Sequence, residues 1–396
     1  MKDEQLQKNK LAFLSGNISW LAILIASIVP IWQSGGLSFS DILFLQGLFA
    51  LVLLILEVPT GVLADAMERR NVIILGHCSL IAGFLVYSQS YHFWGFFLAE
   101  STFAFGLSTL SGAEDALLWD SYKESNREDE INKVIADSRL VMTVSAAVTM
   151  VLGGIIASYN LRAPFYVGAI CSLSNVILYL RAQEPERIKL NSPKLIWIKA
   201  LSYVKDRQFI KVLLLFSTSA VMLRIVFWAY IPKMQELRVP SIWFGIVLAG
   251  ANIVCSITIL IMRRISEASS RLMIVSYGIM GIGLFLFIPV VNLPLLLIAI
   301  VCHQIGRGVI RVVSVVRVNQ IAESEVRASV ASLMSMLGSL FYVISTVSVD
   351  LLGLSMQMIM IVNTMSFIAF VLLWVMIDLS EKQLATIAHE IPNPSL

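Results

Sequence analysis

The sequence predicts an all-α membrane protein with about twelve transmembrane helices in two pseudo-symmetric six-helix bundles. Two observations predict the helices. Of the 396 residues, 58% are apolar and 14% are charged, and hydrophobic runs long enough to cross a bilayer recur along the chain. Motifs that return at a constant offset predict the two bundles. A soluble domain carries about 25% charged residues, so this composition excludes an ordinary soluble enzyme.

Each hydrophobic run is interpreted as one spanning helix, because a helix of about 20 apolar residues crosses the hydrocarbon core. The mean hydropathy of +0.82 agrees with this interpretation, and the polar segments between the runs are too short for a soluble domain. The predicted spans are residues 11–33, 40–63, 71–90, 92–118, 134–158, 163–182, 209–231, 240–262, 272–290, 293–316, 328–350 and 355–378.

The distribution of lysine and arginine predicts which side of the membrane each loop occupies. Twenty-two of these residues fall in segments on the side of the N-terminus, and the opposite side holds only Arg162, Lys233 and Arg238. Cytoplasmic loops carry the excess of positive charge in membrane proteins. We therefore expect both termini in the cytoplasm, and the short loops favour a multi-pass protein of the bacterial inner membrane.

Short motifs of the first half return in the second half about 200 residues later. Pro30 near the end of the first span corresponds to Pro232 at the end of the seventh. Gly106 in the fourth span corresponds to Gly306 in the tenth. The constant offset predicts two six-helix repeats, and transporters with such repeats commonly hold the substrate between them.

The longest polar segment predicts the domain organisation: a bundle at 1–182, a cytoplasmic linker at 183–208 and a second bundle at 209–396. Within the linker, residues 195–207 set apolar side chains among several lysines. This pattern favours an amphipathic helix that lies on the membrane surface. A solvated linker is the alternative.

The turn after the second span reads GVLADAMERR at 61–70. It resembles the signature of the major facilitator superfamily, which has a glycine, three residues, an aspartate and then a basic pair between the second and third spans. The residues that match are Gly61, Asp65, Arg69 and Arg70. Ala66 stands where a basic residue is usual, and Glu68 stands where a glycine is usual. The resemblance implies a secondary transporter that works by alternating access.

Each matching residue of this turn has an expected gating role. Gly61 lets the second span approach a neighbouring helix closely, and Asp65 can lie against the positive N-terminus of another helix. Arg69 and Arg70 can pair with acids on adjoining helices. Together they would hold the two halves together on the cytoplasmic side in the outward-facing state. A charged stop-transfer turn without a gating role is the alternative.

Two further segments carry a finer resemblance. The sequence SGAEDALLWDS at 111–121 closes the fourth span, and EVPTG at 57–61 lies near the end of the second. Together they resemble a branch of bacterial facilitators grouped with drug-efflux proteins, which implies export. The glycine and proline pattern of exporters is reduced in the fifth span to Gly153 and Gly154.

Seven ionisable side chains inside the predicted spans are site candidates, because a charge there is costly unless it faces a partner or a cavity. The acids lie in the first half and the bases in the second: Glu57, Glu100, Glu114, Asp115, Arg224, His303 and Arg307. This segregation predicts salt bridges across a central cavity, or an anionic substrate that neutralises the bases. His303 and Arg307 are four residues apart and therefore share one helix face.

Glu100 lies near the membrane midplane and has no basic residue one turn away in its own helix. The cost of an ionised carboxylate at this depth suits reversible protonation, so Glu100 is the candidate proton-coupling residue. A fixed ion pair with Arg224 or His303 is the alternative. Glu57 is a second candidate for proton coupling, unless its role is to brace the helix break at Pro59.

The remaining candidates are assigned to gating or to the wall of a substrate site. Glu114 and Asp115 lie near the predicted cytoplasmic edge. They are expected to be structural or gating partners of nearby basic residues, which are Arg69, Arg70 and Arg139. Asn17 and Trp228 are uncharged candidates for substrate contacts, although such side chains also line ordinary helix–helix interfaces.

The leading functional hypothesis is a bacterial exporter of small amphipathic molecules or drugs that is driven by proton antiport. The sequence has no Walker motif for a nucleotide, which argues against a primary pump. The alternative is an importer or exchanger of a small organic anion that binds to the bases of the second half. A third hypothesis is a membrane sensor or lipid-handling protein that keeps the fold without coupled transport.

The expected partners are a small-molecule substrate and the lipid bilayer, with no nucleic acid. We expect no enzymatic activity and no cofactor beyond the proton as coupling ion. The four cysteines show no ligand spacing, so no metal site is expected. A monomer is the expected state.

Overall fold

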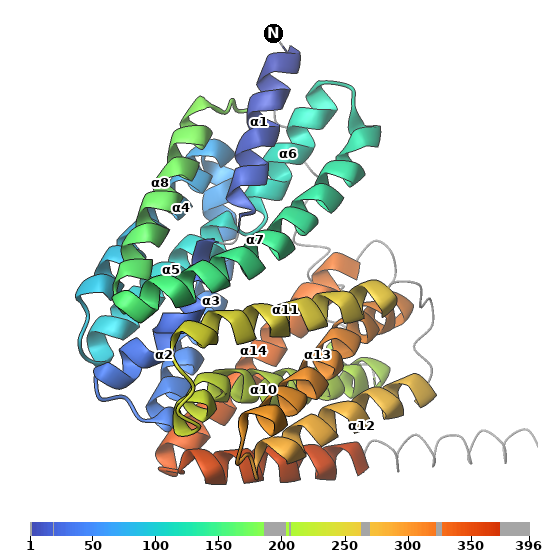
Figure 1. Ribbon diagram of the computed structural model, residues 1–396. Helices are drawn as coiled ribbons and strands as arrows, with labels where there is room; N and C mark the ends of the chain where they lie inside the picture. Colours follow the sequence, from blue (N-terminus) through green and yellow to red (C-terminus); the bar gives the residue numbers. More distant parts are fainter. Residues whose placement is uncertain are drawn as a thin grey trace, which may run out of the picture.

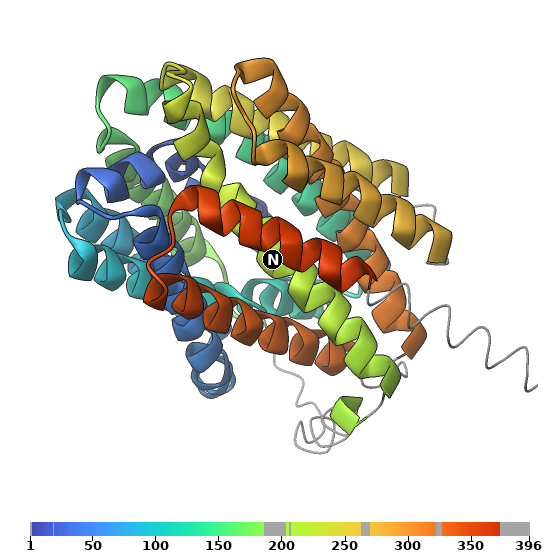
Figure 2. The ribbon, with the colours of Figure 1, turned by 90° about the horizontal axis from the view of Figure 1, so that it is seen from below.

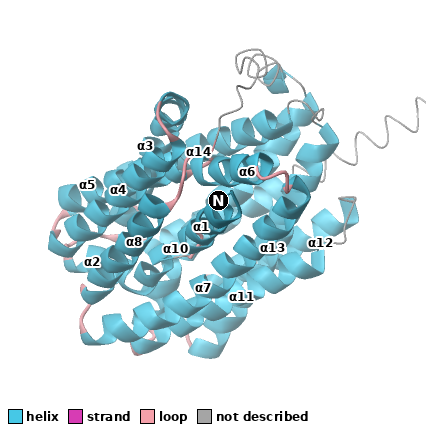
Figure 3. Ribbon diagram, turned by 90° about the horizontal axis from the view of Figure 1, so that it is seen from above, coloured by secondary structure: helices cyan, strands magenta, loops and turns pink. Residues whose placement is uncertain are grey.

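A computed structural model of the chain describes residues 2–18, 20–185, 203–205, 207–262, 270–321 and 327–372. Over these residues the protein consists of helices and short connections without a strand (Figure 3). Eight of the helices are long and apolar enough to cross a membrane, or nine if the bent pair Asp3–Leu24 and Ile28–Ser34 forms one span. Two apolar helices, Val275–Phe287 and Met356–Leu372, are shorter. The all-helical membrane fold is confirmed, and the number of twelve spans stays a prediction.

The described helices follow the order of the predicted spans. The first half contains α1 (Lys2–Gly16), the 3-10 helix η1 (Trp20–Leu24), α2 (Ile25–Ser34), α3 (Phe39–Ala66), α4 (Arg69–Gln89), α5 (Phe93–Leu110), α6 (Ala113–Glu124), η2 (Glu128–Glu130), α7 (Ile131–Tyr159) and α8 (Ala163–Arg181). The second half contains η3 (Tyr203–Lys205), α10 (Arg207–Glu236), α11 (Ile242–Met262), α12 (Ser270–Phe287), α13 (Leu293–Ile321), α14 (Arg327–Leu351) and the helix Met356–Leu372.

The first predicted span, 11–33, is not one continuous helix. Its helix α1 already begins at Lys2 and ends at Gly16, and the chain continues through η1 into α2. At the break, the Asn17 side chain donates a hydrogen bond to the carbonyl of Phe13 at 2.9 Å. A side-chain amide that takes a backbone carbonyl competes with the regular helix, which accounts for the interruption.

The fourth predicted span, 92–118, is also divided. Gly112 has φ +81°, a left-handed conformation that favours glycine, and it separates α5 from α6. Glu114 and Asp115 therefore lie in the first turn of a new helix. Acidic residues are favourable there because of the positive end of the helix dipole.

The two halves form separate bundles in Figure 1, one from α1 to α8 and one from α10 onward. They contact one another chiefly through two helix pairs, α3 with α14 and α7 with α11. Between α2 and α10 the rings of Trp32 and Trp228 lie 5.3 Å apart. In the order of the predicted spans, α2 corresponds to α10, α3 to α11 and α7 to α14. The contact of α3 with α14 is therefore the counterpart of the contact of α11 with α7, which agrees with two related bundles. The predicted boundaries stay a prediction, and most of the 183–208 linker, including its amphipathic helix, lies outside the described residues.

The α7–α11 contact depends on glycine. A Cβ atom placed on Gly154 would lie 2.8 Å from the backbone nitrogen of Gly245, and one on Gly245 would overlap the carbonyl of Met150. The backbones of the two bundles therefore approach directly, as small residues permit in membrane helices. On the other side of the second bundle, the helix Met356–Leu372 packs against α10 and α14 (Figure 2). There Asn363 donates a hydrogen bond to the carbonyl of Met222 at 3.4 Å.

Candidate functional site

A cavity with a volume of about 690 Å³ lies between the two bundles. Its polar side chains come from both halves of the chain: Asn17, His77, Glu114, Asp115, Arg139 and Asn175 from the first, and Asn252, Gln304 and Arg307 from the second. Apolar side chains such as Trp20, Phe227 and Leu248 complete the wall. The sequence candidates Asn17, Glu114, Asp115 and Arg307 are thus brought to one cavity, which we call the central cavity.

A second cavity of about 570 Å³ shares Ser111 and Phe227 with the central cavity and lies between α3, α10 and α14. Its wall brings together the predicted residues Glu57, Arg224 and Trp228. We call this space the lateral cavity. It also includes Gln46.

Glu100 lies behind the wall of the lateral cavity. Its side chain is buried, and its Oε1 accepts hydrogen bonds from the Tyr87 hydroxyl at 2.5 Å and from Gln46 Nε2 at 2.9 Å. The Tyr87 hydroxyl in turn accepts a bond from the Trp32 indole at 3.3 Å. Because Gln46 also lines the lateral cavity, the Glu100 carboxylate is separated from that space by one hydrogen-bonded side chain.

The alternative role for Glu100, an ion pair with Arg224 or His303, is not formed in this structure. The partners of its carboxylate are the neutral side chains of Tyr87 and Gln46. His303 is fully buried in the other bundle, where its Nδ1 lies 2.5 Å from the Tyr230 hydroxyl. His303 lines neither the central nor the lateral cavity.

The two deep arginines of the second half face the cavities without an acidic partner among the described residues. The guanidinium of Arg224 lies 5.1 Å from the ring centre of Tyr342, and that of Arg307 lies 5.7 Å from the ring centre of Phe227. Both side chains are exposed to these spaces. The predicted salt bridges across the cavity are absent from this conformation, and aromatic rings take the place of counter-charges.

Glu114 and Asp115 have different partners, although they are neighbours. The carboxylate of Glu114 accepts a hydrogen bond from the Tyr179 hydroxyl at 3.0 Å and lies 3.3 Å from His77 Nε2. Asp115 pairs with Arg139 at 3.9 Å, with both side chains more than half exposed. Of the predicted basic partners, only Arg139 is used. An exposed pair of this kind contributes little stability.

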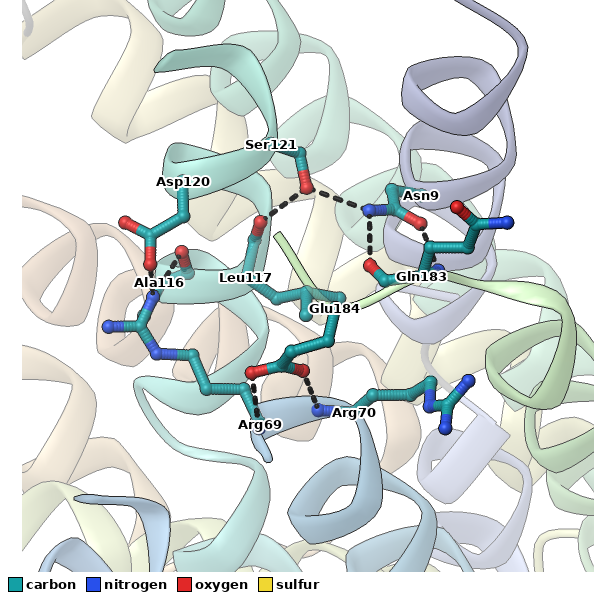
Figure 4. A network of polar contacts seen from close by, with 9 residues as sticks. All are labelled: Asn9, Arg69, Arg70, Ala116, Leu117, Asp120, Ser121, Gln183 and Glu184. Carbon is teal, nitrogen blue, oxygen red and sulfur yellow. Dashed lines mark hydrogen bonds and ion pairs between the residues drawn. The ribbon is translucent and has the colours of Figure 1, made fainter. Parts of the chain in front are cut away.

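The turn between α3 and α4 is held within the first bundle. Arg69 donates to the carboxylate of Asp120 and to the carbonyl of Ala116 at 2.8 Å. The Glu184 carboxylate accepts the backbone N–H groups of Arg69 and Arg70, each at 2.9 Å (Figure 4). A carboxylate at the N-terminus of α4 satisfies free backbone donors and the helix dipole.

A second set of bonds extends this network to α1. The Asn9 amide donates to the Ser121 hydroxyl at 2.8 Å and to the carbonyl of Gln183 at 2.9 Å (Figure 4). We call the residues of Figure 4 the brace, because they join α1, α4, α6 and the chain after α8. Burial raises the pKa of the Asp120 carboxyl above its usual value, and the Arg69 guanidinium opposes this shift.

The predicted gating roles stay predictions. Among the described residues, the polar contacts of Arg69 and Arg70 stay within the first bundle and do not reach the second. A Cβ atom on Gly61 would have no neighbour within 4 Å, so the close helix approach predicted there is not formed. The side chain of Asp65 lies outside the described part of the structure.

Several residues of these clusters are missing from the sequence candidates. Tyr87, His77 and Glu184 are the partners that hold Glu100, Glu114 and the start of α4. His77 could have been found, since it is a titratable residue inside the predicted span 71–90. Tyr87 could not have been singled out, because a tyrosine within an apolar run does not indicate a functional site by itself. Among the described residues, no group of three or more His, Cys, Asp or Glu side chains is arranged to hold a metal ion.

Comparison with known proteins finds relatives that are named as transporters. The inner membrane transport protein YajR of Escherichia coli is 29% identical over 133 residues, which is 33% of this chain and 28% of that protein. The "Uncharacterized transporter BU466" of Buchnera aphidicola is 25% identical over 170 residues, which is 42% of each chain. The chain thus spans less than half the length of the curated relatives it matches.

Solved structures share the fold over most of the chain. The nucleoside transporter NupG superposes with a TM-score of 0.75 at 15% identity, covering 94% of this chain and 98% of that one. A bacterial homologue of the human lysosomal transporter Spinster, in an inward-facing and unoccupied conformation, gives 0.68 at 16% identity, with 86% and 80% covered. At these identities the likeness shows the fold alone.

The family assignment rests on a match to most of the sequence. The family model described as Major Facilitator Superfamily matches residues 11–346. That range contains both cavities and most of the two bundles. The chain therefore belongs to the major facilitator superfamily, a family of membrane transporters and not of enzymes.

Proposed function

We propose that this transporter is driven by protons and exports small amphipathic molecules from a bacterial cell by alternating access. In this proposal both termini face the cytoplasm, and the proton is the coupling ion. The observation that carries the proposal is the hydrogen-bonded cluster of Glu100, Tyr87 and Gln46 beside the lateral cavity. We call it the acidic cluster.

The acidic cluster suits a carboxyl group that changes its protonation during transport. Two neutral donors, Tyr87 and Gln46, support an ionised Glu100, but no cation neutralises it among the described residues. An ionised carboxylate without a cation is stable only while water reaches it. Gln46 borders the lateral cavity, so the water in that cavity controls the charge of Glu100. Opening and closing of the cavity would then couple to proton uptake and release.

The walls of the central cavity support an amphipathic substrate. Trp20, Phe227 and Leu248 offer apolar and aromatic surface, whereas Asn17 and Asn252 offer amide donors and acceptors. Ligand sites commonly combine an apolar wall with a few polar groups that fix orientation. A molecule with one polar end and one apolar end therefore matches this lining.

The experiment that tests the proposal uses Glu100→Gln in proteoliposomes. Glutamine keeps the shape of the protonated acid but releases no proton. We expect the variant to exchange substrate across the membrane at equilibrium and to lose accumulation driven by a pH gradient. The matched control is Glu128→Gln, which removes an exposed acid outside both cavities. Uphill transport by Glu100→Gln with normal proton stoichiometry would move the coupling site first to Glu57 and then to His303.

A second candidate function, import or exchange of a small organic anion, is favoured by one observation. Arg224 and Arg307 face the cavities and have no acidic partner among the described side chains. A bound carboxylate or phosphate would neutralise them. Flux measured against matched panels of lipophilic cations, neutral molecules and organic anions separates the two functions. Preference for anions with no proton movement would favour exchange.

A further inference from the structure

A third cavity, of about 300 Å³, lies within the second bundle between α10, α13 and α14. We call it the side pocket. Of its lining residues, only Arg224 is a site candidate from the sequence. Arg224, Ser335 and Tyr342 border both the side pocket and the lateral cavity. The two spaces therefore share the Arg224 side chain as part of their walls, and the side pocket adjoins the proposed substrate path.

The polar part of the lining of the side pocket carries one positive charge and several hydroxyl groups. Arg224 contributes the guanidinium, and Ser217, Ser335, Ser339 and Tyr342 contribute hydroxyls. No acid is among the described residues that line the pocket, and Arg224 forms no ion pair with any described acid. A guanidinium with neighbouring hydroxyl donors is a set of groups that binds carboxylate or phosphate oxygens.

Ser217 is an independent sign that a polar ligand group belongs here. Its side chain is 2% exposed and lines the side pocket, and its hydroxyl has no hydrogen-bond partner among the described residues. Buried hydroxyls in proteins are nearly always hydrogen-bonded. Many serines in membrane helices bond to a carbonyl of their own helix, as Thr218 does in the next position. Ser217 does not, so its donor is free to bind a ligand.

The rest of the described lining of the side pocket is mostly apolar. Phe216 from α10, Val318 from α13 and Met334 from α14 line it. Gly338 leaves open space beside Ser217, since a Cβ atom there would lie 3.4 Å from the Ser217 hydroxyl oxygen. The pocket volume is at the lower end of the range for small-molecule sites. A short apolar group fits this space, whereas the two acyl chains of a phospholipid are too large.

We propose that the side pocket binds a small organic anion with a short apolar tail. The anionic head contacts Arg224 and Ser217, and the tail packs against Phe216 and Met334. As an assignment of substrate class this rests on the proposed transport function, but binding itself needs neither a gradient nor turnover. The ligand class combines the negative charge that Arg224 requires with the amphipathic character of the cavity walls.

The first experiment compares three ligands that share one tail. Octanoate, octylamine and octanol are titrated by calorimetry into the full chain in nanodiscs of phosphatidylcholine. Octanoate is expected to bind at least about tenfold more tightly than octanol, the gain of a charge-assisted contact, and octylamine more weakly than either. Equal binding of octanoate and octanol would overturn the proposal.

The second experiment changes the charge of the side pocket and its free volume separately. Arg224→Gln should remove the preference for octanoate over octanol, and Arg224→Lys should keep part of it because the charge remains. Gly338→Leu should fill the space beside Ser217 and weaken both ligands, whereas Gly338→Ala fits without overlap and should bind normally. The control is Arg311→Gln, which removes an exposed arginine of α13 that lines none of the three cavities. Unchanged octanoate preference in Arg224→Gln would contradict the assignment even if Gly338→Leu fails to fold.

A third arm distinguishes a soluble anion from a lipid headgroup. The titration is repeated in nanodiscs that contain phosphatidylglycerol. We expect octanoate affinity to change by less than about twofold, because the pocket is too small for a phospholipid. A large loss of affinity in the wild type, absent from Gly338→Leu, would identify a lipid as the occupant and overturn the proposal. None of these readouts depends on proton coupling, so failure of Glu100→Gln to uncouple transport leaves them unaffected.

Discussion

The two bundles each contain a buried tyrosine that organises a polar cluster, but the clusters carry opposite chemistry. In the first bundle Tyr87 donates to Glu100, an acid. In the second bundle Tyr230 lies 2.5 Å from Nδ1 of His303, a base, and accepts a bond from Gln304 at 3.2 Å. Each cluster also has one glutamine at a cavity wall, Gln46 at the lateral cavity and Gln304 at the central cavity.

The acid and the base lie in corresponding helices, Glu100 in α5 and His303 in α13, but the two tyrosines do not, because Tyr87 lies in α4 and Tyr230 in α10. Both tyrosines are enclosed by aromatic rings: Phe103 and Phe165 stack near Tyr87, and Phe287 lies 5.7 Å from Tyr230. The rings exclude water and fix the hydroxyls. An acid in this setting can exchange a proton with the cavity, whereas His303, whose Nε2 has no hydrogen-bond partner among the described residues, holds the Tyr230 hydroxyl in place.

The comparison is tested most directly by removing each tyrosine hydroxyl in turn. Tyr87→Phe deletes a hydrogen bond to the Glu100 carboxylate, and such bonds are worth about 1.5–3 kcal/mol. We expect uphill transport to fall about tenfold or more while equilibrium exchange continues. Tyr230→Phe should cost similar stability without loss of coupling. Flux in proteoliposomes and thermal unfolding measure both effects, and equal loss of coupling in the two variants would contradict the division of roles.

The two glutamines give a second and smaller contrast. Gln46→Leu removes one donor to Glu100 and the polar link to the lateral cavity, so coupling should weaken by about fivefold. Gln304→Leu changes the wall of the central cavity and should raise the KM for substrate at unchanged proton stoichiometry. Measured KM and stoichiometry separate these outcomes. A change of stoichiometry in Gln304→Leu alone would reverse the assignment.

The first bundle has a cap at the end of α4 that the described part of the second bundle lacks. Arg162 donates to the carbonyls of Ser88 and Ser90, each at 2.7 Å, and lies over the Tyr91 ring at 3.8 Å. The residue 200 positions later is Val362. Arg162→Gln should destabilise the protein by about 1 kcal/mol, because the last carbonyls of α4 lose a charged donor. Lysine keeps the positive charge but lacks the planar guanidinium that donates to two carbonyls at once. Arg162→Lys should therefore recover less than half of the lost stability, as measured by thermal unfolding.

Sequence reasoning predicted the type of each deep residue and the bundle that holds it, but not its partner. The placement of Glu57 and Arg224 at one cavity follows from the segregation of acids and bases between the halves. The partners of Glu100 are neutral residues 13 and 54 positions away, and their contact depends on helix rotation, which hydropathy does not report. The same limit explains why Arg69 was expected to reach acids of other helices without Asp120 being named.

Helix boundaries were predictable where apolar runs are uninterrupted and failed where single residues break them. The runs of α4 and α8 match the predicted spans 71–90 and 163–182 within two residues. The breaks at Asn17 and Gly112 lie inside apolar runs and change the direction of the chain without a drop in hydropathy. These breaks place Asn17 and Glu114 at the central cavity, so the errors in the helix prediction fall at the site itself.

The smallest expected effect concerns the brace at the other end of the first bundle. Burial raises the pKa of the Asp120 carboxyl, with Arg69 opposing. The folded protein therefore holds this proton more tightly than the unfolded chain, and the stability contributed by the site is present at low pH and lost as pH rises through the raised pKa. Asp120→Asn cannot ionise, so its stability relative to the wild type should increase as the pH rises above the usual aspartate pKa of about 3.9. Thermal unfolding across this range measures the slope, with Glu128→Gln as the control for an exposed acid. A slope of the opposite sign would mean that the ion pair with Arg69 outweighs burial, and the brace would then be strongest at neutral pH.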